Sequence, residues 1–255
     1  MFQKLIFDFF EIATNVSIML LNTINKQIIV FSDGPKIEEI EIDLPIKVDG
    51  YTFNPSLFRK NNAKNYLAYS KEILKKCVNK PVSLEVISDT PQEMVEQALK
   101  LGALKNNVYV KIPIVFTNGD STKRVFKSLI EQKINLNITA IFTLDQIKNI
   151  ISEIKDTKTI LSVFIGRVFD SGVDGQKHMT EINKFIHNNS NCQSLWASTR
   201  MPYDIIKAIN SKTDIITMQV DQIKKLNNFN KNLNEYSKET VAQFYKDAHE
   251  SGYYF

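Results

Sequence analysis

Cysteine and histidine are both scarce in this chain of 255 residues. The only two cysteines, Cys77 and Cys192, lack the spacing of a metal-binding or redox-active pair. The three histidines are isolated, and none belongs to an HExxH zinc motif. Because metal sites need clustered ligands, we expect no protein-bound metal. Two lone cysteines also indicate a reduced, intracellular compartment, and we expect the protein in the cytoplasm.

Long apolar runs are also missing. No window reaches the roughly 18 uninterrupted apolar residues that a membrane span needs, so we expect no stable membrane insertion. The first 26 residues are rich in apolar residues, but Asp8 and Glu11 interrupt the apolar run and no small-residue cleavage site follows it. Apolar residues recur near helical spacing here, which predicts a packing helix over residues 1–27. A helix that lies on a membrane surface or binds a partner is the alternative.

The charge is nearly balanced, with 32 basic and 28 acidic residues and a net charge of +4. These charges are dispersed along the chain, so we expect no nucleic-acid partner, although a mildly basic protein suits an anionic small substrate. There is no internal repeat and no low-complexity tract. The length fits one large domain with a substantial core.

Past residue 27, short apolar runs alternate with longer amphipathic ones. The short runs are rich in β-branched and aromatic residues, which favours strands. The predicted strands are 28–32, 46–52, 82–87, 108–112, 134–140, 160–165, 194–197 and 214–219. The predicted helices are 63–78, 90–103, 120–131, 143–155, 176–188, 201–210, 220–227 and 237–250, of which the second starts at Thr90 with Pro91 and Glu93 in its first turn.

Eight strands separated by helices predict a parallel sheet, and eight is the number that closes a barrel. We therefore predict an α/β fold, a single (β/α)8 TIM barrel over residues 28–255 with an extra N-terminal helix over residues 1–27. A doubly wound open sheet is the alternative, but no glycine-rich phosphate turn follows the first strand.

Polar residues end or follow seven of the predicted strands. In a TIM barrel the reactive groups sit at the carboxyl ends of the strands, so these side chains converge on one rim. Their convergence is stronger evidence for a site than any one of them. In chain order they are Asp33, Asn54, Glu85, Lys111, Asn137, Thr139, Ser162, Arg167, Ser198 and Arg200.

Lys111 is the most informative of these positions because it interrupts an apolar strand. Burial inside a barrel favours the neutral amine of a lysine, which can form a Schiff base with a carbonyl substrate. Alternation along the strand also allows the opposite, with Tyr109 and Lys111 on a polar outer face. Glu85 poses a similar choice between a structural ion pair and proton transfer.

Two further pairs of polar residues are consistent either with a functional site or with an ordinary surface position. Asn137 and Thr139 are two residues apart and share one face of a strand, which lies either in the site or on an exposed edge. Arg167 and Arg200 follow successive strands and suit a phosphate, which arginine binds through two hydrogen bonds. Surface salt bridges are the alternative for these arginines.

Six short motifs lie at the predicted strand ends: 52–57 (TFNPSL), 83–86 (SLEV), 110–113 (VKIP), 137–139 (NIT), 162–167 (SVFIGR) and 197–200 (ASTR). Their sequences and their order resemble those of the transaldolases and the related fructose-6-phosphate aldolases. The resemblance runs from about residue 28 to the C-terminus and leaves the N-terminal segment uncovered.

The resemblance implies a role for each residue. Lys111 corresponds to the Schiff-base lysine, and Asp33 to the aspartate that takes the proton of the C4 hydroxyl during carbon–carbon cleavage. Glu85 and Thr139 correspond to the pair that handles the water of Schiff-base formation and hydrolysis. The substrate-binding positions are the amides Asn54 and Asn137 for the enamine intermediate, Ser162 and Phe164 beside the substrate, and Arg167, Ser198 and Arg200 for the phosphate.

The implied reaction transfers a dihydroxyacetone unit from fructose 6-phosphate or sedoheptulose 7-phosphate to an aldose phosphate, without a cofactor. A fructose-6-phosphate aldolase, which releases free dihydroxyacetone, is the first alternative. That subgroup tends to carry glutamine in place of Glu85 and tyrosine in place of Phe164. A barrel that only binds sugar phosphates is the second alternative.

Two features depart from the family pattern. Phe53 stands where many members have threonine, so it either packs in the core or reshapes the pocket near Asn54. The N-terminal segment has no counterpart, and self-association through it stays open.

Overall fold

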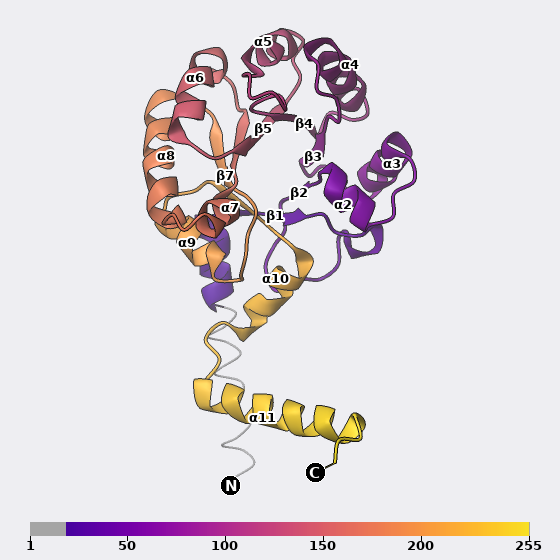
Figure 1. The fold of residues 1–255 in the computed structure, drawn as a ribbon, viewed down its shortest axis with the longest axis vertical. Coiled ribbons are helices and arrows are strands. Elements are labelled where there is room, and N and C mark those ends of the chain that lie inside the picture. Colours follow the sequence, from indigo (N-terminus) through magenta and orange to yellow (C-terminus); the bar gives the residue numbers. More distant parts are fainter. Residues whose placement is uncertain (1–18, 255) are drawn as a thin grey trace.

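The computed structural model describes residues 19–254, in which eight strands form one closed parallel barrel (Figure 1). Each strand pairs with its neighbours in sequence, and the last strand closes the barrel against the first. The predicted TIM barrel is therefore confirmed. The strands are β1 (Ile29–Asp33), β2 (Gly50–Thr52), β3 (Val82–Glu85), β4 (Val108–Pro113), β5 (Leu136–Ile141), β6 (Ile160–Val163), β7 (Gln193–Trp196) and β8 (Ile215–Met218).

Helices surround the barrel on its outer side (Figure 1). Among the described residues, none of them combines the length and apolarity of a membrane span. The helices past residue 27 are α2 (Pro55–Lys60), α3 (Tyr66–Lys76), α4 (Pro91–Gly102), α5 (Lys123–Glu131), α6 (Leu144–Ile154), α7 (Ile165–Asp170), α8 (Gly175–Asn189), α9 (Asp204–Asn210), α10 (Val220–Lys224) and α11 (Leu233–Glu250), with 3-10 turns η1 (Ile37–Glu39) and η2 (Lys225–Asn228). Of these, α11 does not pack around the barrel.

Two short helices correct the predicted elements. The sequence did not predict α2, which starts directly after β2 because Asn54 accepts a hydrogen bond from the backbone N–H of Leu57 and Pro55 occupies the first turn. The predicted strand 160–165 was also too long, because α7 begins at Ile165. Both helices have six residues, too few for a helical period to be visible in the sequence.

Other element ends shift by a few residues. The predicted strand 46–52 shortens to β2, and the predicted helix 237–250 begins earlier, at Leu233, where Asn232 caps it. Thr90 does precede the first residue of α4, but its hydroxyl donates to the Glu93 carboxylate (2.9 Å) and caps no backbone N–H.

Two apolar cores stabilise the barrel. The larger one fills the space between the outer face of the strands and the helices. The smaller one fills the barrel interior and contains Phe31, Ile160, Leu195, Ala197 and Ile215. Gly50 belongs to this packing, because a Cβ atom there would lie only 2.5 Å from the ring of Phe31. The interior is thus a packed core and not a pore.

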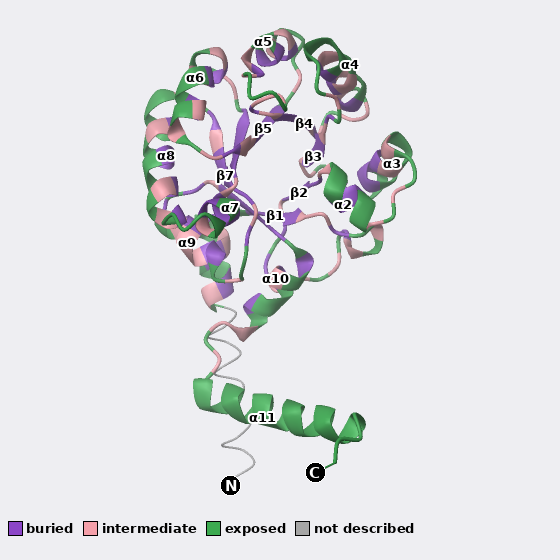
Figure 2. Ribbon diagram, viewed as in Figure 1, coloured by how far each residue is buried: buried purple, intermediate pink, exposed green. Residues whose placement is uncertain are grey.

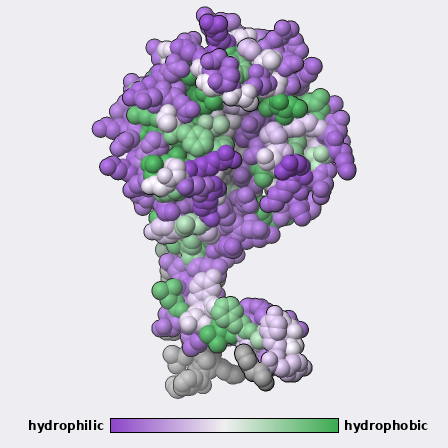
Figure 3. Space-filling model, viewed as in Figure 1, coloured by the Kyte–Doolittle hydropathy of each residue, from purple (hydrophilic) through white to green (hydrophobic). Residues whose placement is uncertain are grey.

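The two ends of the described chain pack very differently. Residues 19–27 are helical, and Leu21 and Ile24 are buried in the larger core. The rest of the predicted helix 1–27 lies outside the described residues, and the division into an extension and a barrel domain stays a prediction. At the other end, α11 lies apart from the barrel and has no buried residue (Figure 2). Hydrophobic side chains on it, such as Val241 and Phe244, are exposed (Figure 3).

The interior core yields a prediction about stability. Phe31→Ala is expected to lower the free energy of unfolding by about 3–5 kcal/mol, because it leaves a cavity under the polar rim. Ile29→Ala is the matched control on the same strand, since Ile29 is exposed, and it should cost less than about 1 kcal/mol. Urea unfolding measures both, and equal losses would contradict the packing of Phe31 in the barrel interior.

Candidate active site

The carboxyl ends of the strands enclose a polar cavity of about 180 Å³. Most of the predicted site residues line it: Asp33, Asn54, Lys111, Thr139, Ser162, Phe164, Arg167, Ser198 and Arg200. The exceptions are Glu85 and Asn137, which do not line the cavity but contact residues that do. Glu85 pairs with Lys111, and Asn137 accepts a hydrogen bond from Ser162. The cavity also includes residues that the sequence did not single out, among them Thr52, Thr217 and Gln219.

Lys111 projects into the barrel interior and is only 4% exposed. Its Nζ atom lies 3.0 Å from Oε2 of Glu85 and donates a hydrogen bond to the carbonyl oxygen of Phe53 (3.1 Å). The parallel register of β3 and β4 pairs Glu85 with Lys111, so the two side chains leave adjacent strands in the same direction. The outer-face alternative for Lys111 is therefore wrong.

Tyr66, from α3, anchors the backbone beside this pair. Its hydroxyl donates to the carbonyl oxygen of Glu85 (2.6 Å) and accepts from the Glu85 backbone N–H (3.0 Å). Burial raises the pKa of Tyr66, and the negative charge of Glu85 raises it further, so the phenol stays protonated. No sequence pattern pointed to Tyr66, which is one aromatic residue in an amphipathic helix.

Asp33 ends β1 and meets the hydroxyl of Thr52, which donates to its Oδ1 atom (2.7 Å). Burial raises the pKa of this carboxyl above its ordinary value, while Lys111 and the Thr52 hydrogen bond pull it down and leave a net rise. Thr217, from β8, in turn contacts Thr52, with 2.6 Å between the two hydroxyl oxygens. Asp33 is thus held by a chain of two buried hydroxyls.

A second polar chain crosses the barrel on the other side of Lys111. Asn137 donates from Nδ2 to the hydroxyl of Ser83 (3.0 Å) and accepts from the hydroxyl of Ser162 (2.7 Å). These two bonds fix the orientation of the amide. The hydroxyl of Thr139 is buried at the cavity wall and has no hydrogen-bond partner among the described residues. A buried hydroxyl of this kind is suited to a water or a substrate hydroxyl.

Two arginines line the cavity from α7 and from the segment after β7, whose backbones touch at Gly166 and Ser198. The guanidinium of Arg167 lies over the ring of Phe164, 5.5 Å from its centroid. Arg200 lines the cavity and also pairs with Asp170 on the surface, through a 3.0 Å hydrogen bond from Nε to Oδ1. Arg200 therefore makes a surface salt bridge, as one alternative expected, and also lines the cavity. Two arginines so placed suit a dianionic phosphate.

Gly166 allows the loop after β7 to approach α7. Ser198 adopts a positive φ of 64°, and its carbonyl oxygen would lie 1.5 Å from a Cβ atom at position 166. A side chain there would have to displace the backbone that carries Ser198 and Arg200. Glycine in the 162–167 motif therefore serves close backbone approach.

Phe53 packs in the core and does not line the cavity. Its ring is fully buried and meets the ring of Phe58 edge-on, with 5.7 Å between the centroids. The neighbouring Asn54 caps α2 through its side-chain oxygen Oδ1, which accepts from the backbone N–H of Leu57, and still lines the cavity. Of the two alternatives for Phe53, the structure supports core packing.

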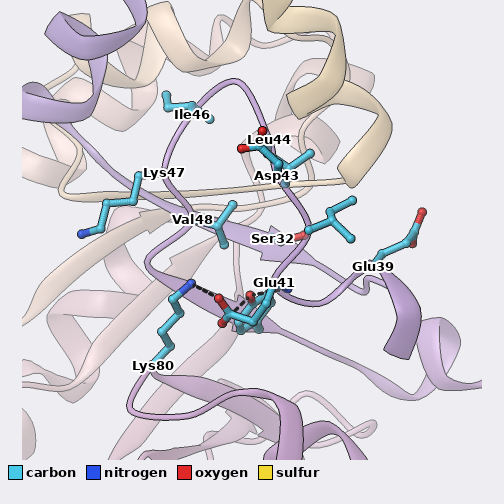
Figure 4. A pocket seen from close by; sticks show the side chains of 11 residues that line it. Ser32, Glu39, Glu41, Asp43, Leu44, Ile46, Lys47, Val48 and Lys80 are labelled. Carbon is cyan, nitrogen blue, oxygen red and sulfur yellow. Dashed lines mark hydrogen bonds and ion pairs between the residues drawn. The ribbon is translucent and has the colours of Figure 1, made fainter.

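A separate cavity lies on the outer side of β1 and β2 (Figure 4). Its walls include Ser32 and Tyr51, which alternate with the inward-facing Asp33 and Thr52. An ion pair between Lys80 and Glu41 (2.8 Å) spans one side of it. None of the predicted site residues lines this cavity.

Within residues 19–254, no group of three His, Cys, Asp or Glu side chains is placed to hold a metal ion.

Comparison with known proteins points to one family. A family model described as Transaldolase/Fructose-6-phosphate aldolase matches residues 30–253. Probable transaldolases from Thermoplasma volcanium and Thermoplasma acidophilum are 37% and 34% identical, each over 77% of this chain and 86% of the relative. A probable transaldolase from Bartonella henselae is 33% identical over 77% of this chain and 87% of the relative.

Solved structures of distant sequence share the fold. A putative phosphonomutase from Burkholderia cenocepacia J2315 has a TM-score of 0.53 at 10% identity, covering 87% of this chain and 94% of that one. A 2,3-dimethylmalate lyase has a TM-score of 0.56 at 8% identity, covering 94% of this chain and 89% of that one. At such low identity these similarities show the barrel fold alone.

The raised pKa of Asp33 predicts how stability depends on pH. A carboxyl whose pKa is higher in the folded protein than in the unfolded chain destabilises the folded state as pH rises from about 3.8 through the folded-state value. Asp33→Asn cannot ionise, so its free energy of unfolding should rise relative to that of the wild type over this range. Urea unfolding at a series of pH values measures the difference. If the free energy of unfolding of the wild type rose relative to that of Asp33→Asn, the attraction of Lys111 for the carboxylate would outweigh the effect of burial on the pKa of Asp33.

Proposed function

The chain belongs to the transaldolase/fructose-6-phosphate aldolase family, and on that premise we propose that it transfers a dihydroxyacetone unit between sugar phosphates through a Schiff base on Lys111. The observation that carries this proposal is the buried amine of Lys111 at the cavity wall, 3.0 Å from a carboxylate. Burying the charged amine of a lysine costs free energy unless the amine is paired. A lysine that acts as a nucleophile needs such a desolvated position at the wall of a substrate cavity.

In the first step, Nζ of Lys111 adds to the C2 carbonyl of the ketose phosphate, and water leaves as the iminium forms. Glu85 is close enough to accept the proton that the ammonium must first lose. Together with the free hydroxyl of Thr139, it is suited to handle the water that leaves and later returns. This supports the predicted roles of Glu85 and Thr139.

In the second step, the carboxylate of Asp33 takes the proton of the C4 hydroxyl. The C3–C4 bond then breaks, and its electron pair moves into the iminium to give an enamine on Lys111. The aldose phosphate leaves, and a second aldose phosphate accepts the dihydroxyacetone unit in the reverse steps. The raised pKa of Asp33 supports this assignment, because a stronger base accepts a proton more readily.

Binding of the remaining atoms falls to the other groups of the cavity. The fixed amide of Asn137 and the amide of Asn54 are suited to the hydroxyls of the bound intermediate. Ser162 and Phe164 would lie along the sugar. The phosphate fits best where Arg167, Ser198 and Arg200 line the cavity.

Transfer is favoured over release by two residues. A carboxylate stands at position 85 and a phenylalanine at position 164, where the aldolase subgroup tends to have glutamine and tyrosine. The relatives at 33–37% identity are also named probable transaldolases. We propose residues 28–255 as the catalytic domain, sugar phosphates as its substrates and the cytoplasm as its location.

Borohydride trapping tests the Schiff base. With fructose 6-phosphate and borohydride, the protein should gain the mass of a reduced dihydroxyacetone adduct, and peptide mapping should place it on Lys111. Lys111→Met should give no adduct. Lys105→Met is the matched control, since Lys105 is also bonded to backbone carbonyls, those of Leu74 and Cys77, away from the cavity. Addition of erythrose 4-phosphate then separates transfer from release.

The absence of an adduct with both fructose 6-phosphate and sedoheptulose 7-phosphate would overturn the proposed mechanism. An adduct that appears equally in Lys111→Met would reject Lys111 as the nucleophile. Turnover that is independent of an acceptor sugar would instead favour the aldolase.

The close approach at Gly166 tests the phosphate site. Gly166→Ala should raise KM for a phosphorylated donor at least roughly tenfold, because its Cβ displaces the backbone of Ser198 and Arg200 and weakens charge-assisted hydrogen bonds. Gly119→Ala is the control for backbone strain alone: its φ of 89° makes alanine strained there, but its Cβ meets nothing within 4 Å and Gly119 does not line the cavity, so KM should not change. Steady-state kinetics measure both variants. An unchanged KM in Gly166→Ala would contradict the binding of the phosphate by Arg167, Ser198 and Arg200.

A further inference from the structure

Two buried threonines approach Asp33 from the strands on either side of β1. Thr52 ends β2 and is 2% exposed, and Thr217 lies in β8 and is 3% exposed. The register pairs Asp33 with Thr52 and Phe31 with Thr217, so both hydroxyls sit at the carboxyl end of the barrel. Their oxygen atoms are 2.6 Å apart.

The single proton on each hydroxyl fixes the direction of this chain. Thr52 donates to Oδ1 of Asp33 over 2.7 Å. Because Thr52 has only one proton and gives it to the carboxylate, the contact between the threonines must be donated by Thr217. With Asp33 ionised, the chain therefore runs from Thr217 to Thr52 to Asp33.

Donation by Thr217 makes Thr52 a better donor, since hydrogen bonds in a chain polarise one another. The backbone of Thr217 is itself held in place, because β8 pairs with β1 and Thr217 lies opposite Phe31 in that pairing. With Thr217 held in place behind it, the hydroxyl of Thr52 keeps its direction towards Oδ1 of Asp33. This restricts the rotation of the Asp33 carboxylate.

We propose that Thr217 is a positioning residue for Asp33, which acts through Thr52 to orient the carboxylate for the cleavage of the C3–C4 bond. The inference rests on the proposed function and adds a residue to it. Schiff-base formation should not depend on Thr217, because Lys111 has its own partners, Glu85 and the carbonyl of Phe53.

Several charged groups also face Asp33. They are Lys111 of β4, Glu85 of β3 and Lys60 of α2, and Arg167 and Arg200 line the same cavity. The two strands that flank β1 add the hydroxyls of Thr52 and Thr217 to this environment. Substitution of Thr217 leaves every one of these charges in place, so a changed pH profile would report on the hydroxyl chain.

Thr217→Val tests the proposal, because valine keeps the shape and removes the hydroxyl. The full-length variant is mixed with fructose 6-phosphate and quenched with borohydride, and intact mass gives the ratio of the hexose phosphate adduct to the dihydroxyacetone adduct. We expect kcat to fall roughly threefold and this ratio to rise by a similar factor. The acidic limb of the kcat profile should move up by roughly 0.3 pH unit, because the carboxylate loses support.

Two variants serve as controls. Thr217→Ser restores the hydroxyl and should restore all three readouts. Thr159→Val removes an equally buried hydroxyl, which contacts Thr157 (2.7 Å) just before β6 at the opposite rim, and should behave as the wild type. If Thr217→Val does not fold, Thr217→Ala provides the same three measurements.

Wild-type values of kcat, pH profile and adduct ratio in Thr217→Val would overturn the inference, and so would equal losses in Thr217→Ser. Either result leaves the Schiff-base mechanism intact, since the wild type still forms both adducts. A wild type that forms no adduct contradicts the proposed function itself and the inference with it.

Discussion

The pair of opposite charges formed by Lys111 and Glu85 is the constraint around which the site is organised. Removing both groups from water is costly, and the cost is recovered only if they stay at bonding distance and their other hydrogen-bonding atoms are satisfied. Adjacent positions in β3 and β4 provide the distance, and the carbonyl of Phe53 takes another proton of the ammonium. Tyr66 of α3 then fixes the backbone of Glu85.

The barrel interior is divided so that this polar layer rests on an apolar one. Below it, Phe31 and Ile215 fill the space between the strands, and above it the cavity opens at the carboxyl ends. The side chains of β1 and β8 alternate, so the strands that supply this packing also supply Asp33 and Thr217 one pleat further on. The packing that stabilises the barrel thereby removes water from one side of the reactive groups.

The sequence predicted the fold well, because β-branched runs of strand length alternate with amphipathic helices. It could not predict α2 and α7, which are set by local caps and turns and are too short for a period. Alternation left two faces open for Lys111, and only the pairing of β3 with β4 settled the inward one. Thr217 and Tyr66 had no signal, since a threonine in a strand or a tyrosine in a helix is ordinary until its partner is known.

A crystal structure of the protein after reduction with borohydride in the presence of fructose 6-phosphate would show directly whether Lys111 carries the sugar. The Schiff-base mechanism predicts continuous electron density from Nζ of Lys111 to C2 of the sugar, with the carboxylate of Asp33 beside the C4 hydroxyl where the hexose adduct is captured. The phosphate of that adduct should lie between Arg167 and Arg200. A covalent adduct on another lysine, or a phosphate bound away from these arginines, would contradict it.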